Sequence, residues 1–404
     1  MDRERPHVRV ALLGSTGSIG RQAVDVLARD ARFQVVGLSA GRNTALLGEQ
    51  IRRLRPAVAV IAADADRDGV GDLPDGTVVG VGDEALEALA ARPDLDLLIV
   101  GTGGVVSLRP VLAALRAGTP VATANKETLV AGGHLVMPLA VGLARARSAL
   151  DRADPLGSTL GWIRPIDSEH SAIWQCLVGE DRASVAGLIL TASGGPFLDL
   201  PAEALANVTA DQALRHPTWT MGAKITVDSA TLANKGLEVI EARWLYDVPY
   251  DVIDVVIHRQ SVVHSAVRFV DGSVKAQLGT PDMRLPIQYA LTYPNRRPSL
   301  AAAPNLVEVG RLDFEAPDVT RFPALRIARE AGGIGPWATA ALIAADDVAV
   351  TRFLAGTLDF AGIPRLLDTA IARYGLRAGA QPDIDDLVAL DGEIRAMYST
   401  GAIA

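Results

Sequence analysis

Between Val8 and Thr123 the chain alternates short apolar runs with stretches of helical spacing. The apolar runs are Val8–Leu13, Phe33–Leu38, Ala57–Ala62, Leu95–Val100 and Pro120–Thr123, and the helical candidates are Arg21–Arg29, Glu84–Ala91 and Leu108–Ala117. Alternation of this kind is typical of parallel strands covered by helices. We therefore predict an α/β fold that begins with a Rossmann-like, doubly wound parallel sheet.

Composition and charge exclude several classes of protein. The 404 residues are enough for two or three domains, and 39 Lys plus Arg against 47 Asp plus Glu give a formal charge of −8. Such a chain has no basic field for a polyanion, so we expect no nucleic-acid partner. A lone cysteine, Cys176, excludes internal disulfides and thiolate zinc clusters. Any metal must therefore be held by oxygen or imidazole.

The start of the chain carries no pattern of a membrane protein. Met1–Arg9 is charged and leads directly into the first apolar run. We find no apolar stretch of the ~18 residues that a membrane span needs. We therefore expect a soluble, cytoplasmic protein with no membrane partner.

A second unit is predicted to begin near Trp162. A helical segment, Glu127–Arg147, leads to the polar stretch Asp151–Leu160, which is typical of a surface excursion or a boundary. The elements expected after it are a strand at Trp162–Ile166, a helix at Glu169–Val178, a strand at Ala186–Thr191 and a long helix at Ala230–Tyr246. Alternating runs at Ser261–Val270 and Ser273–Leu278 flank Asp271-Gly272, which predicts a hairpin. We expect an α+β unit around an antiparallel sheet.

The rest of the chain divides into a connection and a helical tail. Prolines at positions 281, 286, 294, 298 and 304 predict an extended connection. From Phe322 to Gly401 the sequence is rich in Ala and Leu at helical spacing, which predicts a C-terminal helical bundle.

Glycines follow the first predicted strand and open a helix. In Gly14-Ser15-Thr16-Gly17-Ser18-Ile19-Gly20 they would let the backbone approach a pyrophosphate, although a tight strand-to-helix turn would also need them. The second strand leads into Gly41-Arg42-Asn43, which lacks the acidic residue of NAD enzymes. Arg42 suits a 2′-phosphate, although it could be a solvated surface residue. We favour NADP over NAD.

Polar residues also follow a later strand of this sheet. Asn125-Lys126-Glu127 comes after Pro120–Thr123, at the edge where open α/β sheets bind ligands. Helix-capping residues would explain the same triplet.

Two acids end the strand that opens the second unit. In extended chain, Asp167 and Glu169 would share one face about 6.6 Å apart, opposite Ser168. A divalent cation would reverse their repulsion, although capping of a helix N-terminus could also explain both acids. Glu238 is the best candidate for a third ligand of the cation, because it shares a helical face with Asn234 and Lys235. A Lys235–Glu238 surface pair is the alternative.

Four further features suit a site. Gly236 inside a helix indicates close approach by another element. Ser193, beside two glycines, suits a phosphate or an ordinary turn. The loop His216–Gly222 suits a lid, although Trp219 could instead be core. His264 is a structural or a catalytic histidine.

Seven motifs occur together and in order along the chain. They are Gly-Ser-Thr-Gly-Ser-Ile-Gly, Ala-Asn-Lys-Glu, Asp-Ser-Glu-His, Ser-Gly-Gly-Pro-Phe, His-Pro-x-Trp-x-Met-Gly, Asn-Lys-Gly-Leu-Glu and Gln-Ser-Val-Val-His-Ser. With them the chain closely resembles the 1-deoxy-D-xylulose 5-phosphate reductoisomerases over essentially its whole length. The resemblance implies metal-dependent, NADPH-linked rearrangement and reduction of 1-deoxy-D-xylulose 5-phosphate to 2-C-methyl-D-erythritol 4-phosphate, in the non-mevalonate isoprenoid pathway.

The resemblance also implies an organisation into domains. It implies an NADPH-binding Rossmann-like domain at 1–161, a catalytic and dimerisation domain at 162–295, a linker at 296–320 and a C-terminal helical domain at 321–404, assembled as a homodimer. The chain departs from the family at Arg42, where relatives often carry Lys, and at Arg259, where Pro is frequent. Asp151–Leu160 resembles an insertion.

The resemblance assigns roles residue by residue. NADPH would contact Thr16, Gly17, Ser18, Ile19, Gly41, Arg42, Asn43, Asn125, Glu127 and Gly222. Mg²⁺ or Mn²⁺ would be held by Asp167, Glu169 and Glu238. The phosphorylated sugar would contact Lys126, Ser168, Glu169, Ser193, His216, Ser229, Asn234, Lys235 and Glu238. Catalysis would fall to Lys126, His216 and the three acids, with Trp219 and Met221 on a closing flap.

Two other functions remain open on the residues alone. An NADP-dependent semialdehyde or hydroxy-acid dehydrogenase shares the nucleotide fold, but the acylating type needs a cysteine nucleophile and Cys176 lies within a predicted helix. A non-catalytic NADP-binding module would need no acidic trio.

Overall fold

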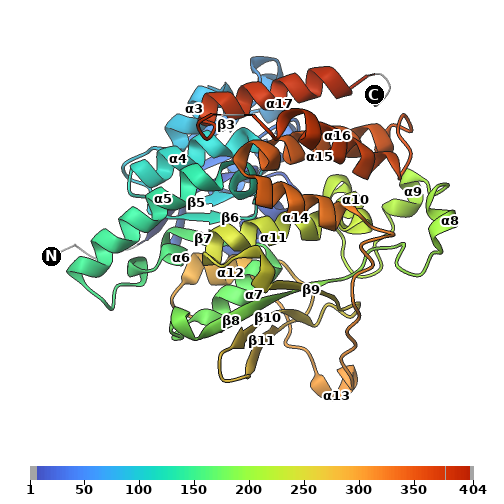
Figure 1. The fold of residues 1–404 in the computed structure, drawn as a ribbon. Helices are drawn as coiled ribbons and strands as arrows, with labels where there is room; N and C mark the ends of the chain where they lie inside the picture. Colours follow the sequence, from blue (N-terminus) through green and yellow to red (C-terminus); the bar gives the residue numbers. More distant parts are fainter. Residues whose placement is uncertain (1–6, 378, 401–404) are drawn as a thin grey trace. The chain divides into compact units, whose positions relative to one another are not determined.

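The computed structural model describes residues 7–377 and 379–400, which form two compact units (Figure 1). Within them, unit 1 comprises 7–125, Leu135–Ser171 and Met283–Ala301, and unit 2 comprises Lys126–His134, Ala172–Asp282 and 302–400. Predicted segments at Met1–Pro6 and at Gly401 lie outside the described residues. The predicted domain boundaries stay a prediction.

Unit 1 is built on a seven-stranded parallel sheet, which confirms the predicted N-terminal architecture. The strand order is β4-β3-β2-β1-β5-β6-β7. The strands are β1 (Val8–Leu13), β2 (Phe33–Ala40), β3 (Val58–Ile61), β4 (Val78–Val81), β5 (Leu97–Val100), β6 (Val121–Thr123) and β7 (Ile163–Pro165). The central strands β1 and β5 are buried from Val10 to Leu13 and from Leu97 to Val100. β4 was not foreseen, because it is short and only partly buried.

Helices cover this sheet, and two of them continue into unit 2. The helices of unit 1 are α1 (Ser18–Leu27), α2 (Thr44–Leu54), α3 (Gly82–Ala90), α4 (Leu108–Arg116), α6 (Thr159–Trp162) and α12 (Arg284–Thr292), with 3-10 turns η1 (Asp64–Val70), η2 (Val105–Ser107) and η3 (Pro155–Gly157). The predicted excursion 151–160 thus contains η3 and the start of α6. The helices shared with unit 2 are α5 (Lys126–Leu150) and α7 (Ser168–Leu177).

The strand predicted at Trp162–Ile166 exists but belongs to the first sheet. β7 pairs in parallel with β6, with Val121 opposite Ile163. The expectation that this strand belongs with the elements of the second unit was wrong, because a strand of three residues carries no information about which sheet it joins. The extended geometry expected for Asp167–Glu169 was also wrong, since α7 begins at Ser168 and the Asp167 carbonyl accepts from the Ser171 N–H at 2.8 Å.

The proline-rich connection also contains a helix where extended chain was expected. α12 runs through Pro286, which lies in its first turn, where backbone N–H groups have no intrahelical acceptor. The helix packs on α1, β6 and β7. The Arg164 Nη1 of β7 donates to the Ala290 carbonyl at 3.0 Å, which ties this late segment to the sheet.

Unit 2 contains a four-stranded sheet in the order β11-β10-β8-β9. Its strands are β8 (Val185–Ala192), β9 (Ile253–Ile257), β10 (Val263–Phe269) and β11 (Val274–Leu278). The predicted β10–β11 hairpin is confirmed, with Gly272 at φ +86° in its turn. The sheet is mixed rather than antiparallel, because β8 and β9 pair in parallel. The helical connection between them was not recognised as a crossover.

Helices make up most of the rest of unit 2. The helix predicted at 230–246 is two helices, α10 (Ala223–Thr231) and α11 (Ala233–Tyr246), separated by Leu232 at φ +60°. The predicted C-terminal bundle is confirmed as α14 (Ala324–Ile334), α15 (Pro336–Leu354), α16 (Gly362–Tyr374) and α17 (Ile384–Tyr398). The short elements are η4 (Arg182–Ser184), α8 (Ala202–Leu205), α9 (Ala210–Ala213), η5 (Tyr250–Val252) and α13 (Leu306–Val309).

The apolar character of α5 exceeds what we expected from the sequence. By length and composition alone its 25 residues could cross a membrane, with a mean hydropathy of 1.5 in its most apolar window. Half of that window is buried. A Cβ at Gly133 would lie 2.5 Å from the Trp244 Cγ of α11, so this part of α5 packs within unit 2 as a core helix does.

The mid-helix glycine Gly236 lets α14 approach α11. A Cβ at this position would lie 2.5 Å from the Ala328 Cβ and 3.3 Å from the Ala324 carbonyl oxygen. The close approach predicted from the helix-interior glycine is therefore confirmed, and the approaching element is the C-terminal bundle.

We predict that Gly236→Ala destabilises the fold, although alanine favours an isolated helix. Overpacking costs about 1–3 kcal/mol, which outweighs the roughly 1 kcal/mol of helix propensity. Thermal unfolding measures the difference. Gly333→Ala in α14 is the control, because a Cβ there meets nothing within 4 Å. A melting temperature for Gly236→Ala at or above that of the parent chain would contradict this packing.

Candidate functional site

The turn between β1 and α1 has the features of an anion cradle. A Cβ on Gly20 would lie 2.1 Å from the Gly14 carbonyl oxygen, so only glycine allows this backbone approach. Gly17 is the N-cap of α1 and supplies no side-chain acceptor, which leaves the first backbone N–H groups of the helix for a ligand. Thr16, Ser18 and Ile19 lie in the same turn or the first turn of the helix. This geometry suits a dinucleotide pyrophosphate.

Two other predicted nucleotide segments lie beyond the ends of strands of this sheet. Gly41, Arg42 and Asn43 follow β2 and are exposed, and the Asn43 Oδ1 accepts from the Leu46 N–H at 3.2 Å. Asn125 follows β6 and is buried, and its Nδ2 donates to the Gly104 carbonyl and the Ser107 Oγ, both at 2.8 Å. Asn125 therefore fixes the loop that follows β5, a role the sequence did not reveal.

The two acids of unit 1 lie where β7 leads into α7. Asp167 precedes the helix and Glu169 lies in its first turn, so both benefit from the positive end of the helix. The Ser168 hydroxyl donates a short hydrogen bond to the Glu169 Oε2. The helix-capping alternative thus describes the backbone correctly, and it leaves open a further role as ligands.

In unit 2 a buried carboxylate is surrounded by cationic and amide donors. Glu238 is 0% exposed. Its Oε1 accepts from the Lys126 Nζ at 3.2 Å and from the Asn234 Nδ2 at 2.6 Å, and its Oε2 accepts from the Lys235 Nζ at 2.5 Å. Lys126 also donates to the Asn234 Oδ1 at 2.5 Å. The surface-pair alternative for Lys235 and Glu238 was wrong, because both side chains are buried.

Lys126 comes to this cluster from the start of α5, while the other three residues belong to α11. Helical spacing predicted the group of Asn234, Lys235 and Glu238. Within α5 and α11, two ammonium groups thus pair with one buried carboxylate.

A second cluster of unit 2 joins Ser193, His216 and Ser229. The Ser193 Oγ lies 2.8 Å from the His216 Nε2 and 3.4 Å from the Ser229 Oγ. Gly195, at φ +69°, permits this contact, because a Cβ there would lie 2.7 Å from the Ser229 carbonyl oxygen. The serine-glycine-glycine segment is therefore more than an ordinary turn, since it brings two hydroxyl groups together.

The backbone of the predicted lid fixes the proton on His216. The His216 Nδ1 accepts from the Thr218 N–H at 3.1 Å and from the Trp219 N–H at 2.9 Å. Burial lowers the pKa of His216, which favours the neutral ring. The proton of that ring must be on Nε2, which donates to Ser193. The Ser193 hydroxyl hydrogen is then available to a substrate oxygen.

Trp219 and His264 lie near each other on facing segments of unit 2. Trp219 is half-buried, and its ring centroid lies 6.1 Å from that of His264 on β10. The predicted loop is also tied to the chain after β9, because the Thr218 Oγ1 donates to the Arg259 carbonyl at 3.3 Å. Burial lowers the pKa of His264 to about 4, so this residue is a neutral group of the core near pH 7.

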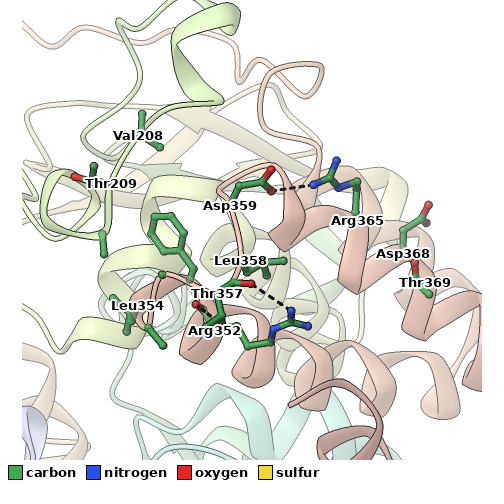
Figure 2. Close-up of a pocket in the computed structure, with 14 residues that line it drawn as sticks. Val208, Thr209, Arg352, Leu354, Thr357, Leu358, Asp359, Arg365, Asp368 and Thr369 are labelled. Atoms are coloured by element: carbon green, nitrogen blue, oxygen red, sulfur yellow. Dashed lines mark hydrogen bonds and ion pairs between the residues drawn. The ribbon is translucent and has the colours of Figure 1, made fainter. Parts of the chain in front are cut away.

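Unit 2 also contains a groove of about 1100 Å³. Figure 2 shows residues that line it. Its lining includes Thr209, Arg352, Asp359 and Arg365. The Arg365 Nη2 pairs with the Asp359 Oδ1 at 2.8 Å. None of the residues predicted for the site lines this groove.

Sequence reasoning missed one charged residue beside the predicted lid. Lys224, in the first turn of α10, lies among carboxylates from three helices. Its partners on α15 are more than a hundred positions away along the chain, so spacing could not reveal them.

We predict that His264 makes the fold acid-sensitive. Its pKa is about 4 in the folded chain, so the unfolded chain, with an ordinary value near 6.5, takes up the proton first as pH falls. The stability is complete above pH 6.5 and is lost as pH falls toward 4. By pH 5 this group alone should cost about 2 kcal/mol.

Chemical unfolding at pH 7 and pH 5 measures this loss in the parent chain and in His264→Gln. The variant lacks the titrating ring, so its stability should fall less between the two pH values. An identical fall in both proteins would contradict the assignment.

The chain matches family models over most of its length. The model for 1-deoxy-D-xylulose 5-phosphate reductoisomerase matches residues 10–133, the model for its C-terminal domain matches 163–246, and a further model for a DXP reductoisomerase C-terminal domain matches 278–397. The reductoisomerase of Pelotomaculum thermopropionicum is 48% identical over 392 residues, 96% of this chain and 97% of that protein. That of Exiguobacterium sibiricum is 45% identical over 399 residues, 98% of this chain and 99% of that protein.

Solved structures agree with these relatives. The Zymomonas mobilis reductoisomerase in complex with NADPH has a TM-score of 0.84 and 36% identity, over 97% of this chain and 98% of that one. A DOX-P reductoisomerase in complex with NADPH, fosmidomycin and magnesium has a TM-score of 0.86 and 35% identity, over 97% of each chain. The chain therefore belongs to the family of 1-deoxy-D-xylulose 5-phosphate reductoisomerases.

Proposed function

We propose that this chain converts 1-deoxy-D-xylulose 5-phosphate into 2-C-methyl-D-erythritol 4-phosphate, with NADPH as the reductant and Mg²⁺ or Mn²⁺ as the metal. The observation that carries the proposal is the buried Glu238 with two lysines and an amide on its oxygens. Such a group of charges is costly to bury, so a ligand or a reaction that needs it accounts for its presence better than stability does. The family supplies that reaction.

The substrate phosphate belongs, in this proposal, at the positive part of unit 2. Lys235 supplies the charge, and Ser193, Ser229 and Asn234 supply neutral donors. The hydrogen bond from His216 sets the direction of the Ser193 hydroxyl. Holding the phosphate keeps in place the part of the substrate that carries it, and a closed lid would hold the other part beside it while the carbon skeleton rearranges. Effective concentration of this kind is worth about 7–11 kcal/mol. Lys126 and Ser168 complete the proposed contacts with the sugar.

The divalent ion is proposed to bind Asp167, Glu169 and Glu238. Carboxylate oxygens are the ligands that Mg²⁺ and Mn²⁺ prefer, and Glu238 uses three of its roughly four acceptor positions, which leaves one for a metal. When bound, the ion would supply Lewis-acid polarisation of the ketone and hydroxyl oxygens. Lys126 would balance negative charge that develops beside it.

The nucleotide is proposed to bind at the ends of β1, β2 and β6. Gly17 and Ser18 would offer backbone N–H groups to the pyrophosphate, with Thr16 and Ile19 beside them. Arg42 would pair with the 2′-phosphate from its exposed loop, flanked by Gly41 and Asn43. Asn125, Glu127 and Gly222 would complete the set. NADPH would supply the hydride that reduces the rearranged aldehyde.

A homodimer in the cytoplasm is the form we propose for the enzyme. β11 is the edge strand of its sheet, and Val274 within it and Val270 before its turn are 56% and 70% exposed. An exposed edge with apolar side chains suits pairing with a second copy.

Sedimentation velocity tests the proposed dimer, and a monomer at micromolar concentration would contradict it.

We predict that Glu238→Gln loses most turnover and keeps its affinity for NADPH. The change removes a proposed metal ligand and leaves two ammonium groups without their carboxylate, but it leaves unit 1 unchanged. The measurements are NADPH oxidation with 1-deoxy-D-xylulose 5-phosphate and NADPH binding by fluorescence. Glu330→Gln is the control, because that acid pairs with Arg326 on the surface of α14.

The same assay tests whether the reaction requires a divalent metal. Chelation should abolish NADPH oxidation by the parent enzyme, and Mg²⁺ or Mn²⁺ should restore it. Full activity of Glu238→Gln, or activity that survives chelation, would refute the metal assignment.

A further inference from the structure

Lys224 lies at the point where the predicted lid enters α10. It is the second residue of the helix, and Gly222 is the N-cap. Its Nζ lies 2.6 Å from the Asp228 Oδ2 on α10 and donates a short hydrogen bond to the Asp346 Oδ2 on α15. The same nitrogen lies 3.9 Å from the Asp347 Oδ1 and 4.0 Å from the Glu127 Oε1 on α5. One ammonium group thus joins three helices of unit 2.

The carboxylates around Lys224 differ in whether they have another cationic partner. Asp347 has a second partner, because the Arg395 Nη2 lies 2.7 Å from its Oδ2. The Asp228 and Asp346 side chains are 3% and 1% exposed, and in each the Oδ1 is buried without a hydrogen-bond partner among the described residues. Burial alone would lower the pKa of Lys224, but the four acids together raise it well above its ordinary value. The Lys224 ammonium group is therefore the cation that compensates the buried Asp228 and Asp346.

Local helix energetics do not account for a lysine at this position. A cation in the first turn lies at the positive end of the helix dipole, which disfavours it. A lysine four residues before an acid is also the weaker orientation of such a pair. The contacts with α15 and α5 must therefore stabilise the arrangement.

We propose that Lys224 is a positioning residue for NADPH. The inference rests on the proposed function, in which Gly222 and Glu127 contact the cofactor. Lys224 lies two residues after Gly222 and is paired with Glu127, so it holds both contacts against the same helix, α15. The C-terminal bundle thereby sets the position of the cofactor contacts on α5 and at the end of the lid.

Loss of the ammonium group would change the geometry in a defined way. Burial and the neighbouring Asp346 hold the pKa of Asp228 well above its ordinary value, so without the ammonium group Asp228 keeps a proton. Glu127 and Asp346 would then repel each other, and Glu127 is the more exposed of the two, with 12% of its side chain accessible. Glu127 is therefore the group that turns away. Lys235 and Asn234, which bind Glu238, lie outside this cluster, so the phosphate contacts should persist.

The test compares the full-length parent chain with Lys224→Met, Lys224→Arg and Arg326→Met. Arg326 is a matched control, because it forms an exposed pair with Glu330 at the same spacing of four residues. NADPH dissociation constants are measured by fluorescence without substrate or metal. Steady-state kinetics then give kcat at saturating NADPH and the KM for the sugar phosphate.

For Lys224→Met we expect the NADPH dissociation constant to rise about tenfold, which corresponds to 1.4 kcal/mol, with kcat at saturating NADPH and the KM for the sugar phosphate each within about threefold of the parent. Lys224→Arg should restore most of the affinity, and Arg326→Met should match the parent. An unchanged dissociation constant in Lys224→Met would overturn the proposal, as would a fall in kcat with no loss of NADPH affinity.

Asp346→Asn covers the case in which Lys224→Met does not fold. It removes one carboxylate with little change of shape and leaves Lys224 paired with Asp228. NADPH affinity should fall about threefold, and an unchanged affinity would overturn the proposal. A different result would contradict the proposed function and not the role of Lys224. In that case the parent chain would bind NADPH but would not oxidise it with 1-deoxy-D-xylulose 5-phosphate.

Discussion

The buried charge of Glu238 is the constraint on which the catalytic half of the molecule depends. A carboxylate with no solvent contact needs partners, and here they are Lys126, Asn234 and Lys235. These partners fix the start of α5 against the first turns of α11. Replacement of the group by apolar side chains would often cost nothing in stability, so its presence indicates a function.

Close packing of neighbouring backbone segments holds the helices and strands that carry these charges. Gly236 brings α14 against α11 on the turn that carries Lys235 and Glu238. Gly195 brings the end of β8 against Ser229, which places the Ser193 and Ser229 hydroxyl groups together, and Ser193 also contacts His216. The ion pair between Lys224 and Asp346 also joins α10 to α15, by charge and not by close packing. The C-terminal bundle, which carries none of the family motifs, therefore supports the helices that do.

Local periodicity predicted much of the fold and part of the site. The parallel sheet, the β10–β11 hairpin and the shared helical face of Asn234, Lys235 and Glu238 all follow from spacing within a few residues. One assignment between distant segments failed, because a strand as short as Ile163–Pro165 does not indicate its neighbour in the sheet. The bond from His216 to Ser193 and the pairing of Lys224 with Asp346 were invisible for the same reason. The identity of the site came from motifs in order, which spacing alone could not supply.

The proposed mechanism requires one divalent ion bound by Asp167, Glu169 and Glu238. Crystals grown with Mn²⁺ and NADPH provide the direct measurement, because the ion can be located by its anomalous scattering. We predict a single strong peak with oxygens of Asp167, Glu169 and Glu238 about 2.0–2.6 Å away, the range of oxygen ligands on hard divalent ions. A peak held by other residues, or none at these three acids, would contradict the account.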